Sequence, residues 1–104
     1  MFNASLTSGN YFDRLAYLRA VSRKAETLRA RNLKLQVRFM KARRKAGIPY
    51  SVPQPQCFAD LWLLLHDEWS TRVMLQEDPQ GFYQEYFRLQ AECNVEIRKL
   101  KGGA

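Results

Sequence analysis

Hydrophobic residues in the first half of the chain recur every three or four positions, which is the spacing of one face of an α-helix. No glycine or proline interrupts this pattern over residues 10–46. Asn10, with a carboxylate three residues later, is a suitable N-cap, and Gly47 followed by Pro49 is typical of a helix C-terminus. We therefore predict one long helix over residues 10–46, preceded by a flexible arm over residues 1–9.

From Leu18 onward the apolar spacing alternates between three and four, as in a heptad seam. We predict that the centre of this seam and its bordering arginines bind a partner: Leu28, Asn32, Leu35, Phe39, Arg31 and Arg38. Asn32 has two interpretations, a register-setting polar residue between two helices or a solvent-facing residue at the edge of the stripe. A second apolar set widens the surface, so more than one neighbour is expected to pack on this helix: Leu33, Val37 and Met40.

The second half of the chain predicts two further helices. Three prolines over residues 47–56 indicate an extended linker, and apolar spacing over residues 57–77 indicates a second helix. Asp78 and Pro79 together are typical of a helix start, so a third helix should follow and complete an antiparallel hairpin over residues 57–101. Most aromatic residues of the hairpin are expected in its core: Phe58, Trp62, Trp69, Phe82, Tyr86 and Phe87.

The predicted fold is a single all-α domain over residues 1–104 with three helices. The first helix should be about 55 Å long and the other two about 30 Å each. The hairpin is therefore too short to cover the whole apolar seam of the first helix. We expect the chain to associate through this helix, most simply as a homodimer.

Basic residues are concentrated in the first helix. The chain has 104 residues and a net charge of +7. Residues 13–45 contain twelve Lys and Arg against two Asp and Glu, whereas the rest contains five against eight. The basic helix is therefore expected to lie partly against the acidic hairpin. The densest cluster predicts an anion patch for nucleic-acid phosphates or an acidic protein surface, although cations also stabilise a helix C-terminus: Arg38, Lys41, Arg43, Arg44 and Lys45.

Residues with reactive side chains do not form a catalytic or metal-binding motif. His66 and Asp67 are adjacent, so on a helix they point about 100° apart rather than toward one another. Cys57 and Cys93 lack the paired spacing of zinc ligands and are expected to be reduced thiols. We predict no enzymatic activity, no cofactor and no metal site.

The remaining signals concern aromatic anchors and compartment. Tyr50 and Tyr83 are candidate anchors for a partner, because interfaces are enriched in Tyr and Arg. The first residues lack the basic and apolar regions of a signal peptide, which predicts a cytoplasmic protein. Membrane attachment is not favoured, because the apolar face of the first helix is needed for packing.

The leading hypothesis is a non-catalytic regulatory or adaptor protein, for example an antiactivator, inhibitor, chaperone or complex subunit. It would bind another protein that offers an apolar groove or helix with an acidic rim. The alternative is a basic, dimeric nucleic-acid-binding regulator that uses the cluster at residues 38–45. The sequence itself does not name the partner.

Overall fold

The computed structural model describes the backbone of residues 4–102 and the side chains of residues 11–102. This part of the chain forms four helices and no strand: α1 (Ala4–Lys45), α2 (Gln56–Leu64), α3 (Glu68–Glu77) and α4 (Pro79–Leu100). The predicted all-α class is therefore confirmed. The molecule is elongated, 66 × 22 × 19 Å, because the 42 residues of α1 span about 63 Å. No helix among these residues combines the length and hydropathy needed to cross a membrane.

The C-terminus of α1 lies where the sequence predicts it. Gly47 has a positive φ of 74°, and its N–H donates to the carbonyl of Arg44 at 3.0 Å. The N–H of Ile48 donates to the carbonyl of Arg43 at 3.1 Å. These two bonds form a Schellman motif, which satisfies carbonyls that the helix leaves unpaired at its end.

The N-terminus of α1 differs from the prediction. The helix already begins at Ala4, so Asn10 lies inside it and is not the N-cap. The predicted arm is therefore wrong for residues 4–9, and residues 1–3 lie outside the described residues. The physical reason is that residues 4–9 contain no proline, and a single glycine does not stop a helix that is already formed on its C-terminal side.

The predicted helix over residues 57–77 is two helices, because a break at residues 65–67 separates α2 from α3. The carboxylate of Asp67 caps α3 by accepting from the backbone N–H of Ser70 at 3.0 Å and from its hydroxyl at 3.1 Å. On the α2 side, Arg29 of α1 donates from Nε to the carbonyl of Leu65 at 2.9 Å. The break thus has hydrogen-bond partners on both sides, and a continuous helix would lose them.

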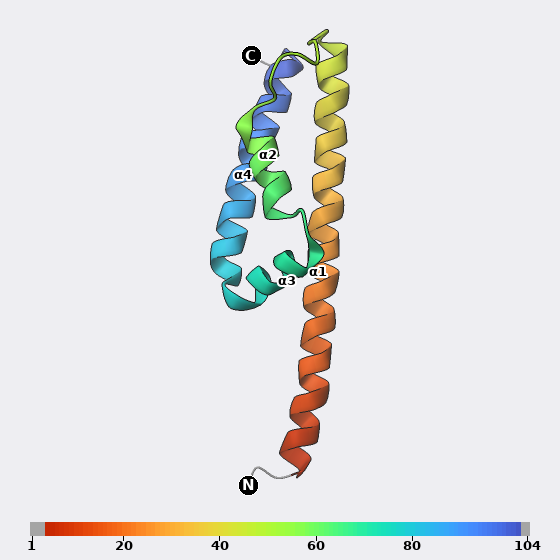
Figure 1. The fold of residues 1–104 in the computed structure, drawn as a ribbon, viewed down its shortest axis with the longest axis vertical. Coiled ribbons are helices and arrows are strands. Elements are labelled where there is room, and N and C mark those ends of the chain that lie inside the picture. The colour runs from red at the N-terminus through yellow and green to blue at the C-terminus, as the bar shows by residue number, and fades with distance from the viewer. Residues whose placement is uncertain (1–3, 103–104) are drawn as a thin grey trace.

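Figure 1 shows α2 and α4 lying along the C-terminal half of α1, while α3 crosses the helix nearer its middle. The ring of Phe39 on α1 stacks on Phe58 of α2, with centroids 4.0 Å apart. Leu89 and Ile97 of α4 are fully buried in the same core. The N-terminal part of α1 extends past α3 without a neighbouring helix (Figure 1). This agrees with the expectation that the shorter helices cannot cover all of α1.

The aromatic residues of the C-terminal helices divide between core and surface. Phe58, Phe82 and Tyr86 are buried, as expected. The predicted core position is wrong for three others, which are about half exposed or more: Trp62 (49%), Trp69 (65%) and Phe87 (56%). The break before α3 is one cause, because it interrupts the helical period that placed the two tryptophans on one face.

We expect Asp67→Ala to lower the melting temperature at neutral pH, because α3 loses its capping acceptor. The backbone and hydroxyl hydrogen bonds from Ser70 hold the pKa of Asp67 below its ordinary value of 3.8. This stabilisation is therefore present above pH 3.8 and is lost as the pH falls through the lowered pKa of the folded protein. Circular dichroism melts should show the difference between wild type and Asp67→Ala shrinking in acid.

Asp67→Asn is the matched control, because asparagine keeps a capping oxygen and does not titrate in this range. Its melting temperature should exceed that of Asp67→Ala at every pH. A difference between wild type and Asp67→Ala that stayed constant down to about pH 2 would contradict the assignment of the cap to the ionised carboxylate.

Candidate interaction surfaces

The predicted partner-binding seam lies inside the molecule. Leu28, Asn32, Leu35 and Phe39 are only 2–5% exposed. The expectation of an available seam is therefore wrong at these residues. The reason is that the C-terminal helices lie beside this part of α1 and cover it from within the same chain. The bordering side chains of Arg31 and Arg38 remain exposed.

Asn32 and its neighbour Gln36 connect α1 to α2. The side-chain amide of Gln36 donates to Oδ1 of Asn32 and to the backbone carbonyl of Phe58, both at 3.3 Å. Asn32 is 3% exposed, so the interpretation as a solvent-facing residue is wrong. Asn32 instead helps to fix the register between α1 and α2. Its Oδ1 accepts from Gln36, and the same Gln36 amide is held by the α2 backbone at Phe58.

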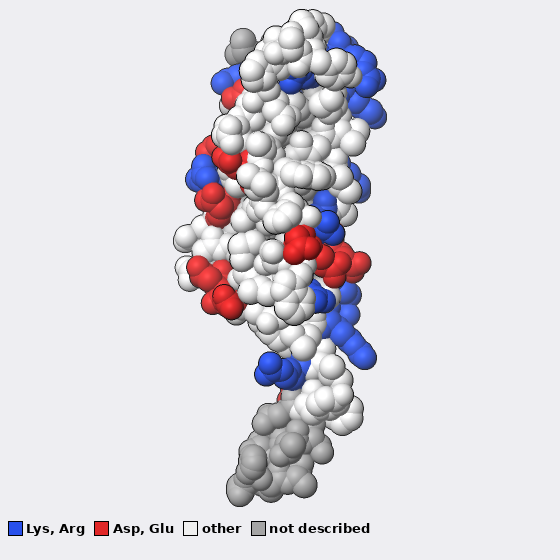
Figure 2. Space-filling view, viewed as in Figure 1, with Lys and Arg blue, Asp and Glu red and all other residues white. Residues whose placement is uncertain are grey.

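Basic and acidic residues occupy different parts of the molecule. Figure 2 shows Lys and Arg along the edge formed by α1, up to its C-terminal end, whereas many Asp and Glu lie toward α4. Within the described residues, every ion pair joins residues of a single helix, α3 or α4: Arg72–Glu68, Arg88–Glu85, Arg88–Glu92 and Lys99–Glu96. The basic helix α1 does lie against the acidic helices, as expected, but the acids that form ion pairs among the described residues do so with cations on their own helices.

The predicted basic cluster at residues 38–45 divides into three parts. Arg43 is 8% exposed, and its guanidinium donates to the carbonyls of Pro49, at 2.8 Å, and Val52. It therefore holds the linker and does not belong to an accessible patch. Arg44 lines a separate depression beside Tyr50. The other three cations share a cleft with the end of α4: Arg38, Lys41 and Lys45.

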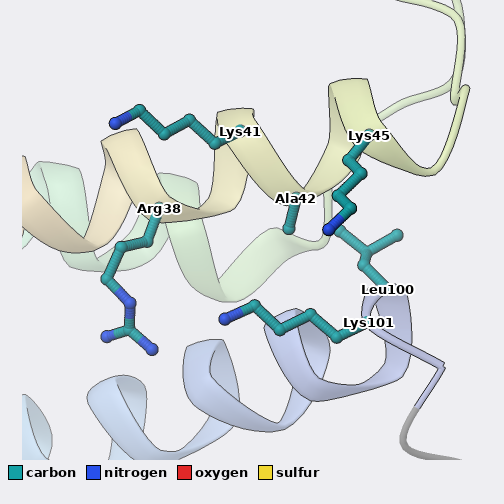
Figure 3. Close-up of a pocket in the computed structure, with 6 residues that line it drawn as sticks. All are labelled: Arg38, Lys41, Ala42, Lys45, Leu100 and Lys101. Atoms are coloured by element: carbon teal, nitrogen blue, oxygen red, sulfur yellow. The ribbon is translucent and has the colours of Figure 1, made fainter.

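This cleft lies between the C-terminal ends of α1 and α4 and has a volume of about 470 Å³. Lys101 joins it from the end of α4, so four cations and no carboxylate are among the described residues that line the cleft. Figure 3 shows Arg38, Lys45 and Lys101 reaching into the space between the two helices, whereas Lys41 lies along α1. Four unpaired cations around one opening favour an anionic ligand.

The cleft continues along α1 as a cationic stripe, which we define as Arg31, Lys34, Arg38, Lys41 and Lys45. The spacing of three and four residues places all five side chains on one face of the helix, and all five are exposed. Like charges at these spacings destabilise a helix by about 0.2–0.5 kcal/mol per pair. The helix dipole favours only the cations of the last turn, so it does not explain Arg31 or Lys34. The stripe is therefore not a stabilising feature of α1.

A third face of α1 is apolar and exposed. Leu33, Val37 and Met40 are 54%, 50% and 37% exposed, and no other helix of the described chain covers them. Leu33 shares a depression of about 420 Å³ with Trp62 of α2, and Met40 shares one of about 260 Å³ with Tyr50. We call the surface formed by these five residues the exposed apolar face. The second neighbour that the sequence predicts for this side of α1 does not come from the described residues.

No protein-family model, curated protein or solved structure matches this chain.

The two predicted aromatic anchors lie far apart. Tyr50 is 81% exposed in the linker at the C-terminal end of α1. Tyr83 is partly buried near the start of α4, where its ring stacks on Phe87 with centroids 6.0 Å apart. Figure 1 places these two segments at opposite ends of α4. Tyr50 therefore belongs to the exposed apolar face, and Tyr83 does not.

The side chains with reactive groups serve local structure. Nδ1 of His66 lies 2.8 Å from the carbonyl of Leu63, and the neighbouring Asp67 caps α3. Cys57 and Cys93 are buried, and burial raises the pKa of both thiols, which keeps them protonated at neutral pH. Among the described residues, no three His, Cys, Asp or Glu side chains are grouped so that they could hold a metal ion.

Three members of the two surfaces are not predicted from the sequence: Lys34, Trp62 and Lys101. The place of Lys34 could have been found, because the regular spacing of cations between residues 31 and 45 is visible in the sequence. Trp62 and Lys101 come from other helices, and only the packing of the chain places them beside α1.

We expect Lys34→Glu to stabilise the protein by about 1 kcal/mol, because it replaces repulsion from Arg31 and Arg38 by attraction. Urea unfolding should show a higher midpoint with an unchanged slope. Lys24→Glu is the matched control, because it makes the same change in charge with no charged residue three or four positions away. Equal stabilisation by both variants would show that the net charge, rather than the stripe, destabilises the helix.

Proposed function

We propose that this protein acts without catalysis, as a small adaptor or regulator that binds another protein through the exposed apolar face. One observation carries the proposal: α1 has two apolar faces, and the described residues cover only one of them. Leu33, Val37 and Met40 lie at positions i, i+4 and i+7, the spacing by which one helix packs against another. Each is more than a third exposed.

The charge around this face favours a particular partner. Arg29 and Glu26 both line the depression that contains Trp62, whereas Arg44 and no carboxylate are among the described residues that line the one that contains Tyr50. An amphipathic helix with an acidic residue at the Tyr50 end would therefore meet apolar side chains at the centre and an unopposed arginine at that end. A second copy of this chain would instead bring together two molecules that each carry a charge of +7. We therefore propose a different protein as the partner, rather than a homodimer.

Affinity purification from nuclease-treated native extract tests the proposal. Wild-type protein should retain a partner in high salt, and Val37→Glu should lose it, because a carboxylate would be buried without a counter-charge. The retained partner is then purified, and its dissociation constant is measured by calorimetry. We expect Val37→Glu to weaken binding by at least about tenfold.

Val95→Glu is the matched control, since Val95 is a 38% exposed valine on α4, outside the exposed apolar face. It should bind the partner as wild type does. Two results would contradict the proposal: equal weakening by both variants, or light scattering that shows a wild-type dimer dissociated by Val37→Glu. The second result would assign the face to self-association.

A further inference from the structure

We propose that the cationic stripe, together with Lys101, binds the phosphate backbone of double-stranded nucleic acid without reading its sequence. This inference goes beyond the proposed protein-binding function and concerns a different face of α1. It rests on the spacing of the five stripe residues, on their exposure, and on the cleft where Lys101 joins them from α4.

The stripe is long enough to face several phosphates of a duplex. From Arg31 to Lys45 it is about 21 Å long, because each residue of a helix rises 1.5 Å. A duplex carries one phosphate charge per about 1.7 Å of its axis, so about twelve phosphates lie along this length. Lys101 widens the row of cations at its C-terminal end. This length of duplex therefore presents more phosphates than the six cations, so each cation can face a phosphate on the near side.

The composition of the stripe favours nucleic acid over an acidic protein. Protein interfaces have a buried apolar centre with aromatic anchors. Within the part of the chain that the structure describes, the cleft is lined by two apolar residues, Ala42 and Leu100, and by no aromatic residue. Trp62 and Tyr50 belong instead to the exposed apolar face. A row of cations without an apolar centre is suited to a regular polyanion, in which most of the binding energy is electrostatic.

The fold also indicates how a duplex would be contacted. A helix that reads bases enters the major groove, which is about 12 Å wide and accommodates little more than the helix itself. Residues 31–45 of α1 carry α2 and α4 on their buried face, so only the exposed faces can approach a duplex, and the stripe presents only Lys and Arg there, which suit phosphate contacts. Binding to single strands relies on stacked aromatic side chains, which the cleft lacks. The surface therefore contacts phosphates of a duplex from outside.

Fluorescence anisotropy with a labelled 20-base-pair DNA duplex, in 50–200 mM NaCl, tests this inference. The logarithm of the binding constant should fall with the logarithm of the salt concentration with a slope of about −5, for six phosphate contacts. A duplex of unrelated sequence should bind within about threefold. The double variant Lys41→Gln and Lys45→Gln should bind at least about tenfold more weakly in 100 mM NaCl, with a slope smaller in magnitude by about 2.

The control is the double variant Arg19→Gln and Arg44→Gln, which removes the same charge from exposed positions of α1 outside the stripe. It should change affinity by less than about threefold. Lys34→Glu is an independent variant of the stripe. Because we predict that it stabilises the protein, weaker binding by this variant would not be caused by unfolding. It should also weaken binding and reduce the slope.

Three results would overturn the inference. One is the absence of saturable binding at 50 mM NaCl. Another is equal weakening by the stripe and control variants, which would show that net charge alone is responsible. The third is displacement of the duplex by polyglutamate at a lower concentration than by unlabelled duplex, which would assign the stripe to an acidic protein surface.

Discussion

The packing of α2 and α4 against one face of α1 is the constraint on which the rest of the structure depends. A helix of 42 residues with so many unpaired cations gains most of its stability from packing rather than from its own propensity. That packing centres on the stack of Phe39 on Phe58, and Gln36 fixes its register through Asn32 and the α2 backbone. Once this face is buried, the positions of the two exposed faces follow from the helical period.

Three faces of α1 therefore have three different chemistries. The buried face forms the core, the exposed apolar face is the one that we propose for a partner helix, and the cationic stripe is the one that we propose for a duplex. The ion pairs of α3 and α4 leave the stripe without local carboxylate partners among the described residues. The two proposals are compatible, because the surfaces point in different directions from the same helix. Together they describe an adaptor that could hold a protein beside nucleic acid.

Local signals in the sequence predicted the parts of the fold that depend on local hydrogen bonds. Gly47 ends α1, and Asp78 caps α4 through the N–H of Gly81, as expected. The break before α3 was missed because part of its stabilisation comes from Arg29, 36 residues away in sequence. Periodicity showed which face of α1 is apolar, and the same seam residues are buried. It did not show whether the covering residues belong to the same chain or to a partner.

The sequence predicts only part of the candidate surfaces, again because packing between distant residues decides which side chains lie together. Arg43, Arg44 and Lys45 are consecutive in sequence, but each residue turns about 100° around the helix, so a contiguous cluster is divided among several faces. Arg43 is buried against the linker, while Lys101 comes from another helix.

The most direct test of the central claim is an isotope-filtered NOE experiment on a mixture of labelled and unlabelled protein. The account predicts ring contacts between Phe39 and Phe58 within single molecules only. Contacts between the Phe39 ring of a labelled molecule and the Phe58 ring of an unlabelled one would show that a second copy covers the seam. That result would contradict the account.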